Sequence, residues 1–295
     1  MIDRPDIAII GAGRVGTAVG VLAARANWPV AAVASRTPAS AEAAARRIGP
    51  DVRAVSPVEA ARAGGLVLLT VPDGAVAGVC AELAEEGALV HRPLVAHCSG
   101  ALDSGVLSPA RRVGCEAASC HPLQTFPTVA AAVERLGGAS FFIEGDESAA
   151  QALERLVAAV GGRARRIAGG TKVLYHAAAV MACNELVALL DGAARLGAAA
   201  GLDPREHLAA LGPLVRATVE NVLSLGAERA LTGPVERGDV ETVRRHAEAL
   251  GGVEAPLRAA YCALGRLTVD LARRKGSIDA ETARALRAAL DAADT

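Results

Sequence analysis

Residues 7–16 read IAIIGAGRVG, an apolar run that ends in a glycine-rich turn. The Ala- and Val-rich segment 17–26 follows directly and continues as a predicted helix. A G-x-G-x-x-G turn between a strand and a helix is the context in which this motif binds a dinucleotide. The alternative is an ordinary glycine-rich turn without a ligand. In both cases the stretch predicts the opening strand and helix of a doubly wound α/β domain.

Each glycine of this turn has its own physical role. Gly11 permits the tight turn, Gly13 leaves the path of a pyrophosphate open, and Gly16 lets the helix pack closely on the strand. Arg14 and Val15 open the helix, where the aligned peptide dipoles place about half a positive charge. We therefore expect these five residues to bind the diphosphate of the dinucleotide.

The end of the second predicted strand indicates which dinucleotide is bound. An NAD binder usually places an acid about 20 residues beyond the glycine motif, on the ribose 2′-hydroxyl. This chain has Ser35, Arg36 and Thr37 there instead. A guanidinium can grip a 2′-phosphate through its planar fork, and the two hydroxyls can add donors. These residues predict NADP, unless Arg36 is a solvated surface charge and Thr37 only caps the next helix.

Short apolar runs alternate with Ala-rich segments through the first half of the chain. Several of the runs are continuously apolar, which is typical of strands buried on both faces. The alternation predicts a mainly parallel, doubly wound sheet. The predicted strands are Ile7–Ile10, Val30–Ala34, Val52–Val55, Leu66–Val71, Leu94–His97, Val113–Ser119, Ser140–Glu144 and Ala164–Ala168.

The pattern changes after Gly169 and Gly170, beyond which we find no convincing strand. Asp203-Pro204, Asp239 and Asp279 mark helix starts. We therefore predict an α/β fold class followed by an all-α one, with an NADP-binding Rossmann domain at 1–168 and a helical domain at 169–295. The predicted helices span 171–200, 204–229, 239–250, 254–275 and 279–292.

Composition excludes some classes of partner. Of 295 residues, 52% are hydrophobic and 2% aromatic, so Ala, Val and Leu must fill the core. The 31 Lys and Arg nearly balance the 32 Asp and Glu. A general binder of nucleic acid or of an anionic membrane would carry a basic excess. We expect a small-molecule substrate and no nucleic acid.

Other features of the chain predict its location. The longest stretch without a charged side chain, 117–133, contains His and Pro and falls short of the about 20 apolar residues of a membrane span. The chain starts with acidic residues and no secretory-signal pattern, so we expect a cytoplasmic protein. The cysteines follow no zinc spacing, and we expect reduced thiols and no metal site.

The candidate chemical residues follow the later strands and open the helical half. Ligands of parallel sheets sit beyond the carboxyl ends of the strands. We expect Val71 and Pro72, after the fourth strand, to contact the cofactor. Ser99 lies in the segment HCSG (97–100) and His121 in HPLQTF (121–126). The first helix of the second domain adds Lys172, His176 and Asn184.

A dehydrogenase needs a proton donor or acceptor beside the hydride acceptor, and fixed dipoles for the developing charge. Lys172, His121 and His176 could each serve as the donor. Ser99, Gln124 and Asn184 could supply the dipoles. The structural alternative is that the histidines are packed or surface residues and that His121-Pro122 is only a turn.

The motifs resemble those of bacterial Rossmann-like proteins with a helical domain of unknown function, the DUF2520 group of the 6-phosphogluconate dehydrogenase-like superfamily. HPLQTF (121–126) and TGPVERGD (232–239) are the more specific of them. The other matching pieces are GAGRVG (11–16), SRT (35–37), TVPD (70–73), HCSGAL (97–102) and KVLYHAAAVMACN (172–184).

The resemblance implies an NADP-dependent oxidoreductase that is dimeric through its helical domain. In the related β-hydroxyacid dehydrogenases a helix lysine moves the proton, and Lys172 matches it by position. His176 stands where those enzymes have an asparagine, and their glycine-rich substrate loop is absent, which implies a different substrate.

Three functions follow from the residues and the resemblance together. The first is reduction or oxidation of a small carbonyl, imine or hydroxy-acid compound, such as a 2-oxo acid, by NADP(H). The second is NADP(H) sensing or scaffolding without chemistry. The third is an NADP reductase linked to a deazaflavin (F420).

Overall fold

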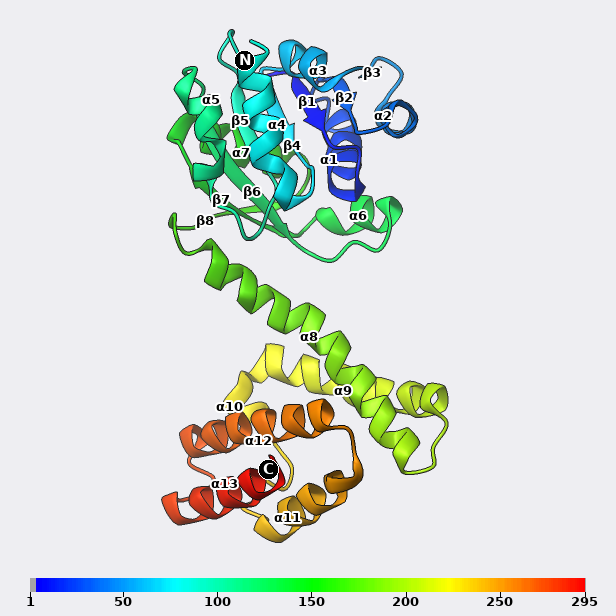
Figure 1. Ribbon diagram of the computed structural model, residues 1–295, viewed down its shortest axis with the longest axis vertical. Helices are drawn as coiled ribbons and strands as arrows, with labels where there is room; N and C mark the ends of the chain where they lie inside the picture. The colour runs from blue at the N-terminus through cyan, green and yellow to red at the C-terminus, as the bar shows by residue number, and fades with distance from the viewer. Residues whose placement is uncertain (1–3, 295) are drawn as a thin grey trace. The chain divides into compact units, whose positions relative to one another are not determined.

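The computed structural model of the chain describes residues 4–294 and divides them into two compact units (Figure 1). The first unit ends at Asn184 and the second begins at Glu185. Both residues lie in helix α8 (Lys172–Ala199), so the first turns of this helix belong to the first unit. Residues 1–3 and 295, at the outer ends of the two predicted domains, lie outside the described residues.

The first unit is built on a sheet with the strand order β3-β2-β1-β4-β5-β6-β7-β8. Neighbouring strands from β3 to β6 run parallel, β7 is antiparallel to β6, and β8 is parallel to β7. The predicted doubly wound, mainly parallel sheet is therefore confirmed. The strands are β1 (Ile7–Ile10), β2 (Val30–Ala34), β3 (Arg53–Ala54), β4 (Leu66–Leu69), β5 (Leu94–His97), β6 (Ala117–Leu123), β7 (Ser140–Gly145) and β8 (Arg163–Arg166).

Strand β6 differs from its prediction at both ends. The predicted strand at 113–119 starts too early, because Val113 is the C-terminal cap of helix α5 and the strand begins at Ala117. It also continues through His121 to Leu123, where the pairing with β7 extends it. Strand β5 pairs with β6 only as far as Ser119, so Pro122 lies where β6 has β7 on one side alone, an edge position that suits a residue without an N–H.

Helices cover both faces of the sheet, which gives the first unit two separate cores. Ile7 and Ile9 of β1 pack into one core, whereas Ala8 and Ile10 pack into the other, as the alternation of side chains along a strand requires. The helices of this unit are α1 (Arg14–Arg25), α2 (Pro38–Ile48), α3 (Pro57–Ala63), α4 (Asp73–Glu85), α5 (Ser108–Arg112), α6 (Val129–Leu136) and α7 (Glu147–Ala159).

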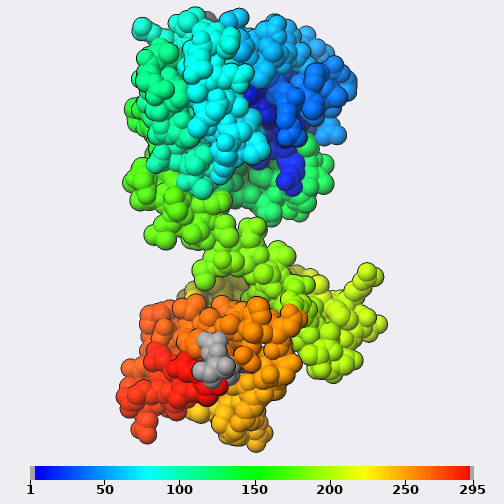
Figure 2. All heavy atoms as spheres, viewed as in Figure 1, coloured from blue at the N-terminus to red at the C-terminus, as the bar shows by residue number. Residues whose placement is uncertain are grey.

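The second unit is helical throughout its described residues. Its core lies among α11, α12 and α13, and Figure 2 shows the last two helices, in orange and red, packed side by side. The predicted helix 204–229 is interrupted at Gly226, whose φ of +80° ends α9. The helices are the second half of α8, α9 (Pro204–Leu225), α10 (Ala227–Ala230), α11 (Val240–Ala249), α12 (Ala255–Lys275) and α13 (Ala280–Asp294).

Helices α8 and α9 are unusually apolar for their exposure. Within the described residues, these two helices are long and apolar enough to cross a membrane by length and composition, a test that the core helix of a soluble protein also passes. No residue of α9 is buried. Leu214 and Leu223 are among its exposed apolar side chains.

Candidate functional site

The glycine-rich turn between β1 and α1 lies directly against the end of β4. Gly11 has a φ of +118°, and a Cβ there would come within 2.6 Å of the carbonyl carbon of Thr70. The Thr70 hydroxyl donates a hydrogen bond to the Gly11 carbonyl oxygen at 2.7 Å. A Cβ on Gly16 would overlap the same hydroxyl and the Gly11 carbonyl oxygen. The first and third glycines of the motif are therefore required by close packing.

The middle of the turn is open. No atom lies within 4 Å of the position that a Cβ on Gly13 would take. No side chain caps the start of α1, so its first amides have no side-chain partner there. Arg14 is exposed and donates a hydrogen bond to the Phe126 carbonyl oxygen at 2.8 Å. Free amides, an open approach and a nearby cation fit the diphosphate of a dinucleotide.

The residues after β2 are those from which the sequence predicts a 2′-phosphate site. Arg36 is exposed, and it forms no hydrogen bond or ion pair with any other described residue. Thr37 caps α2, because its hydroxyl accepts a hydrogen bond from the Ser40 amide at 3.3 Å. Ser35 is half-buried beside them. The Arg36 guanidinium is thus available to a ligand, whereas the Thr37 hydroxyl already has a structural role.

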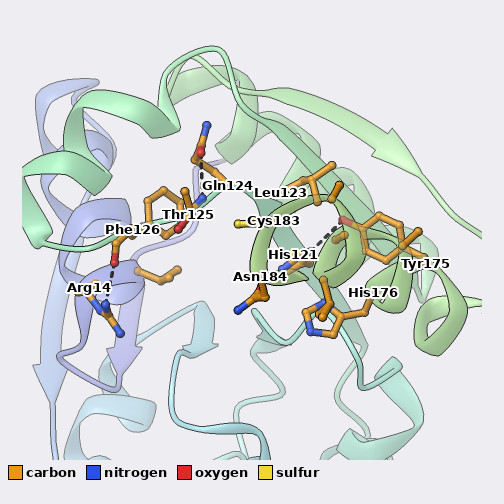
Figure 3. Close-up of a pocket in the computed structure, with 15 residues that line it drawn as sticks. Arg14, His121, Leu123, Gln124, Thr125, Phe126, Tyr175, His176, Cys183 and Asn184 are labelled. Atoms are coloured by element: carbon orange, nitrogen blue, oxygen red, sulfur yellow. Dashed lines mark hydrogen bonds between the residues drawn. The ribbon is translucent and has the colours of Figure 1, made fainter. Parts of the chain in front are cut away.

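A cavity of about 710 Å³ lies beside the start of α1, and all its lining residues belong to the first unit (Figure 3). Its floor comes from three elements that are distant in sequence. They are the start of α1, the end of β6 with the segment after it, and one side of α8. The lining residues that carry polar or sulfur-containing side chains are Arg14, His121, Gln124, Thr125, Tyr175, His176, Cys183 and Asn184.

Three aromatic polar side chains meet at one end of this cavity. The Tyr175 hydroxyl and Nδ1 of His121 are 2.9 Å apart and share a hydrogen bond, which is drawn in Figure 3. The rings of His121 and His176 meet edge to face, with centroids 5.5 Å apart. A Cβ on Gly100 would press on both imidazoles, so only glycine fits beneath them. Phe142 of β7 packs against the Tyr175 ring at 4.5 Å and helps to hold it.

Burial sets the protonation of this cluster. It lowers the pKa of His121 to about 4, and the positive charge of Lys172 acts in the same direction. It raises the pKa of Tyr175 to about 12. At neutral pH the cluster therefore holds a neutral imidazole and a protonated phenol, which can share one hydrogen bond in either direction.

Lys172 lies in the same helical turn, in a network closed to solvent. Its side chain is 1% exposed. The ammonium donates hydrogen bonds to the Ser99 carbonyl oxygen at 2.6 Å and to the Ser119 hydroxyl at 2.7 Å. The Ser119 hydroxyl in turn donates to the Glu144 carboxylate at 2.7 Å. Burial lowers the pKa of Lys172, although Glu144 opposes this shift.

The network continues on both sides of Lys172. Glu144 also accepts hydrogen bonds from the amide and the hydroxyl of Ser104, at 2.6 and 2.9 Å. The Ser99 hydroxyl donates to Asp73 at 2.8 Å and accepts from the amides of Ala101 and Leu102. The side-chain groups of Lys172 and Ser99 are therefore engaged within the protein, and neither residue lines the cavity.

The structure thus divides the candidate catalytic residues into two groups. His121, His176 and Asn184 line the cavity, whereas Lys172 and Ser99 are buried beside it. Arg14 and Val15 line the cavity beside the glycine turn, whereas the half-buried Val71 and Pro72, the residue before α4, do not line it. No group of His, Cys, Asp or Glu side chains among the described residues could hold a metal ion.

Sequence reasoning missed two residues of this region. Tyr175 stands next to His176 and three residues after Lys172, a spacing that places it near both on the helix surface. The signal in the sequence that could have identified it is a phenol beside two candidate site residues. Glu144 ends an otherwise apolar strand pattern, and a buried acid there requires a partner.

Comparisons with known proteins agree with this architecture. A Rossmann-like domain is matched at residues 2–122, and the domain of unknown function DUF2520 at residues 139–268. The chain therefore carries a Rossmann-like domain followed by a DUF2520 domain, an arrangement consistent with a 6-phosphogluconate dehydrogenase-like fold. No curated protein matches it at a significant level.

Solved structures share the fold over nearly the whole chain. A protein from Thermotoga maritima is 24% identical, with a TM-score of 0.71, over 92% of this chain and 99% of its own. A Bacteroides fragilis protein provisionally named an NADP oxidoreductase is 24% identical, with a TM-score of 0.66, over 94% of this chain and 100% of its own. Plasmodium falciparum pyrroline carboxylate reductase with NADP bound is 14% identical, with a TM-score of 0.56, over 100% of this chain and 98% of its own.

Proposed function

We propose that this protein is an NADP(H)-dependent oxidoreductase that transfers a hydride to or from a small carbonyl, imine or hydroxy-acid compound. The observation that carries the proposal is the position of the cavity. It begins at Arg14 and Val15, beside the open glycine turn, and ends at the hydrogen-bonded pair of Tyr175 and His121. A ligand on the turn can therefore reach the same space as a substrate.

The residues at the turn fit the dinucleotide. Gly11, Gly13 and Gly16 shape the turn, and the amides that open α1 would hold the diphosphate. Arg36 would bind the 2′-phosphate, with Ser35 beside it. When bound, NADPH supplies the hydride, and the chain has to supply only binding, orientation and a proton.

The walls of the cavity indicate the class of substrate. Apart from Arg14 at one end, no Lys, Arg, Asp or Glu side chain lines the cavity, and the low pKa of His121 keeps that imidazole neutral at neutral pH. Alanines of α8 form much of the wall: Ala178, Ala179 and Ala182. These features favour a small carbonyl or imine compound of low polarity. A 2-oxo acid is the most polar substrate that we propose.

The burial of Lys172 favours one second candidate, an NADP(H)-sensing or scaffold protein without chemistry. In that case the lysine that the resemblance places in proton transfer would be purely structural. The two proposals differ in whether bound NADPH is oxidised by added carbonyl or imine compounds.

We also propose that the protein is a cytoplasmic homodimer joined through its helical domain. The exposed apolar side chains of α9 support this, because large apolar patches on soluble proteins mark interfaces. Light scattering in solution tests it, and a monomer that stays dispersed at high concentration would contradict it.

The cofactor assignment is tested by titrating the purified protein with NADPH and NADH. Arg36→Ala should weaken NADPH binding by roughly tenfold to a hundredfold, the value of one or two charge-assisted hydrogen bonds, and leave NADH binding unchanged. Arg46→Ala removes an exposed guanidinium of α2 that is paired with Glu42, and it serves as the matched control. Equal affinity for the two dinucleotides in the unmodified protein would contradict the assignment.

A further inference from the structure

We propose that Tyr175 is the proton donor to the substrate and that His121 stabilises the phenolate that Tyr175 becomes. This inference rests on the proposed oxidoreductase function and names the group that completes it.

Lys172, the donor implied by the family resemblance, is not placed to meet a ligand. Two of its three ammonium protons are directed at the Ser99 carbonyl oxygen and the Ser119 hydroxyl. Its side chain is 1% exposed and does not line the cavity. A substrate would have to break this network and desolvate Glu144 before the ammonium could reach it.

Tyr175, in contrast, is placed to meet a ligand in the cavity. Its side chain lines the cavity, and its hydroxyl is held by Nδ1 of His121 at 2.9 Å. Contacts with Phe142 and with the edge of the His121 ring fix the phenol on two sides. A group that is both oriented and open to the cavity satisfies the geometric requirement for a general acid.

The proposed step balances as follows. As the substrate carbon gains a hydride from NADPH, which becomes NADP⁺, the π-electron pair of its C=O or C=N bond moves to the heteroatom. The O–H bond of Tyr175 breaks, and its proton forms the new O–H or N–H bond of the product. The Nδ1–H of His121 donates a hydrogen bond to the resulting phenolate, and water returns the proton after the product leaves.

This step requires one particular tautomer of His121. Nδ1 must carry the proton, so that the phenol oxygen accepts the hydrogen bond and the phenolic proton is free for the substrate. Nε2 of His121 is then an acceptor, and it lies above Gly100 together with Nδ1 of His176. Nδ1 of His176 is buried and has no hydrogen-bond partner among the described residues. No hydrogen bond to another group therefore holds this nitrogen away from Nε2 of His121.

The molecule contains a matched control for this pair. In the second unit, the Tyr261 hydroxyl also lies 2.9 Å from a histidine Nδ1, that of His246. Tyr261→Phe therefore removes the same kind of hydrogen bond at a place that the proposal does not involve.

The first experiment measures NADPH oxidation with a panel of cyclic imines, ketones and oxo acids. Tyr175→Phe should lower kcat by about a hundredfold or more, the usual value of a general acid, with the Kd for NADPH unchanged. Tyr261→Phe should leave both unchanged. Full activity of Tyr175→Phe overturns this inference and leaves the proposed function standing, whereas failure of the unmodified protein to bind NADPH overturns the proposed function itself. A protein that binds NADPH but oxidises it with no compound of the panel overturns both.

The second experiment needs no substrate. Nitrogen NMR of histidine-labelled protein reports the tautomer of each imidazole, and His121→Gln assigns the signals of His121. We expect the Nδ1–H tautomer, with an Nδ1 shift that changes in Tyr175→Phe. An Nε2–H tautomer would show that the phenol donates to His121 and would overturn the inference.

Discussion

Lys172 and Tyr175 lie within one turn at the start of α8, but they enter different environments. Lys172 points among the ends of β5, β6 and β7, where serine and glutamate groups surround it and water does not reach. Tyr175 points toward His121 and an open cavity. The difference shows that polar residues in one helical turn become closed to solvent or open to a cavity according to the neighbouring segments that they meet.

The two environments also differ in the stability that the fold loses when one partner is removed. A buried ammonium and a buried carboxylate stabilise a fold only while both are present and hydrogen-bonded, because either charge alone is strongly disfavoured. A neutral phenol and a neutral imidazole carry no such penalty. Removal of one partner should therefore destabilise the Lys172 network far more than the Tyr175 pair.

The largest effect should come from Lys172→Met. This change leaves the Glu144 charge buried without its cation, and it should lower the free energy of unfolding by about 3–5 kcal/mol. Urea denaturation measures the loss. Adding Glu144→Gln should restore part of it, because the two residues belong to one network. A loss below about 1 kcal/mol would place Lys172 outside any structural network.

The next effect is a dependence of stability on pH. Burial lowers the pKa of His97 from its ordinary 6.5 to about 4, and its side chain is fully buried. The unfolded chain therefore binds the proton more readily, so the stability contributed by neutral His97 is complete above pH 6.5 and is lost as the pH falls toward 4. The loss should be about 3 kcal/mol, and His121 should add to it.

Urea denaturation at several pH values checks this prediction. His97→Asn keeps an acceptor for the Ser99 amide, which now bonds to Nδ1 of His97, but it removes the titration. Its unfolding free energy should fall less on acidification than that of the unmodified protein. Equal slopes would mean that His97 does not titrate between the two states.

A smaller effect should follow from Gly100→Ala. The added methyl group presses on His121 and His176, and overpacking of this kind costs about 1–3 kcal/mol. NADPH oxidation should fall as the imidazoles move, with NADPH binding retained. Gly78→Ala in α4 is the control, since no atom lies within 4 Å of its new Cβ. Wild-type activity of Gly100→Ala would show that the positions of His121 and His176 do not affect the reaction.

The smallest effect on stability should be that of Tyr175→Phe. It removes one hydrogen bond between neutral groups, which is worth about 1 kcal/mol. Urea denaturation should show a loss several times smaller than that of Lys172→Met. If the two losses were equal, the Tyr175 pair would be as structural as the Lys172 network, and the contrast between them would fail.

The local sequence was a good guide where one interaction dominates. The glycine motif predicted the turn correctly, and the structure adds the reason, since a Cβ on Gly11 or Gly16 would overlap Thr70 at the end of β4. The helical second half was likewise readable from its caps. The limits of β6 were not, because its pairing with β7, made late in the chain, extends it beyond the apolar run.

Sequence reasoning selected the right segments for the site but could not sort the residues within them. It placed His121, His176 and Asn184 together, and all three line the cavity. It also placed Lys172 and Ser99 with them and overlooked Tyr175 and Glu144. On the helix surface, Lys172 and His176 are close neighbours, so their spacing alone could not show that the protein separates them.

The sequence by itself determined the order of strands and helices, the glycine turn and the basic residue after β2, since these depend on backbone sterics, side-chain periodicity and near neighbours. Only the tertiary structure decided which polar side chains face water and which face each other. That choice depends on segments more than fifty residues from Lys172 in the chain, since Ser99 and Ser119 meet it from separations of 73 and 53 residues. Burial, and not residue type, therefore divides these residues into a group closed to solvent and a group that lines the cavity.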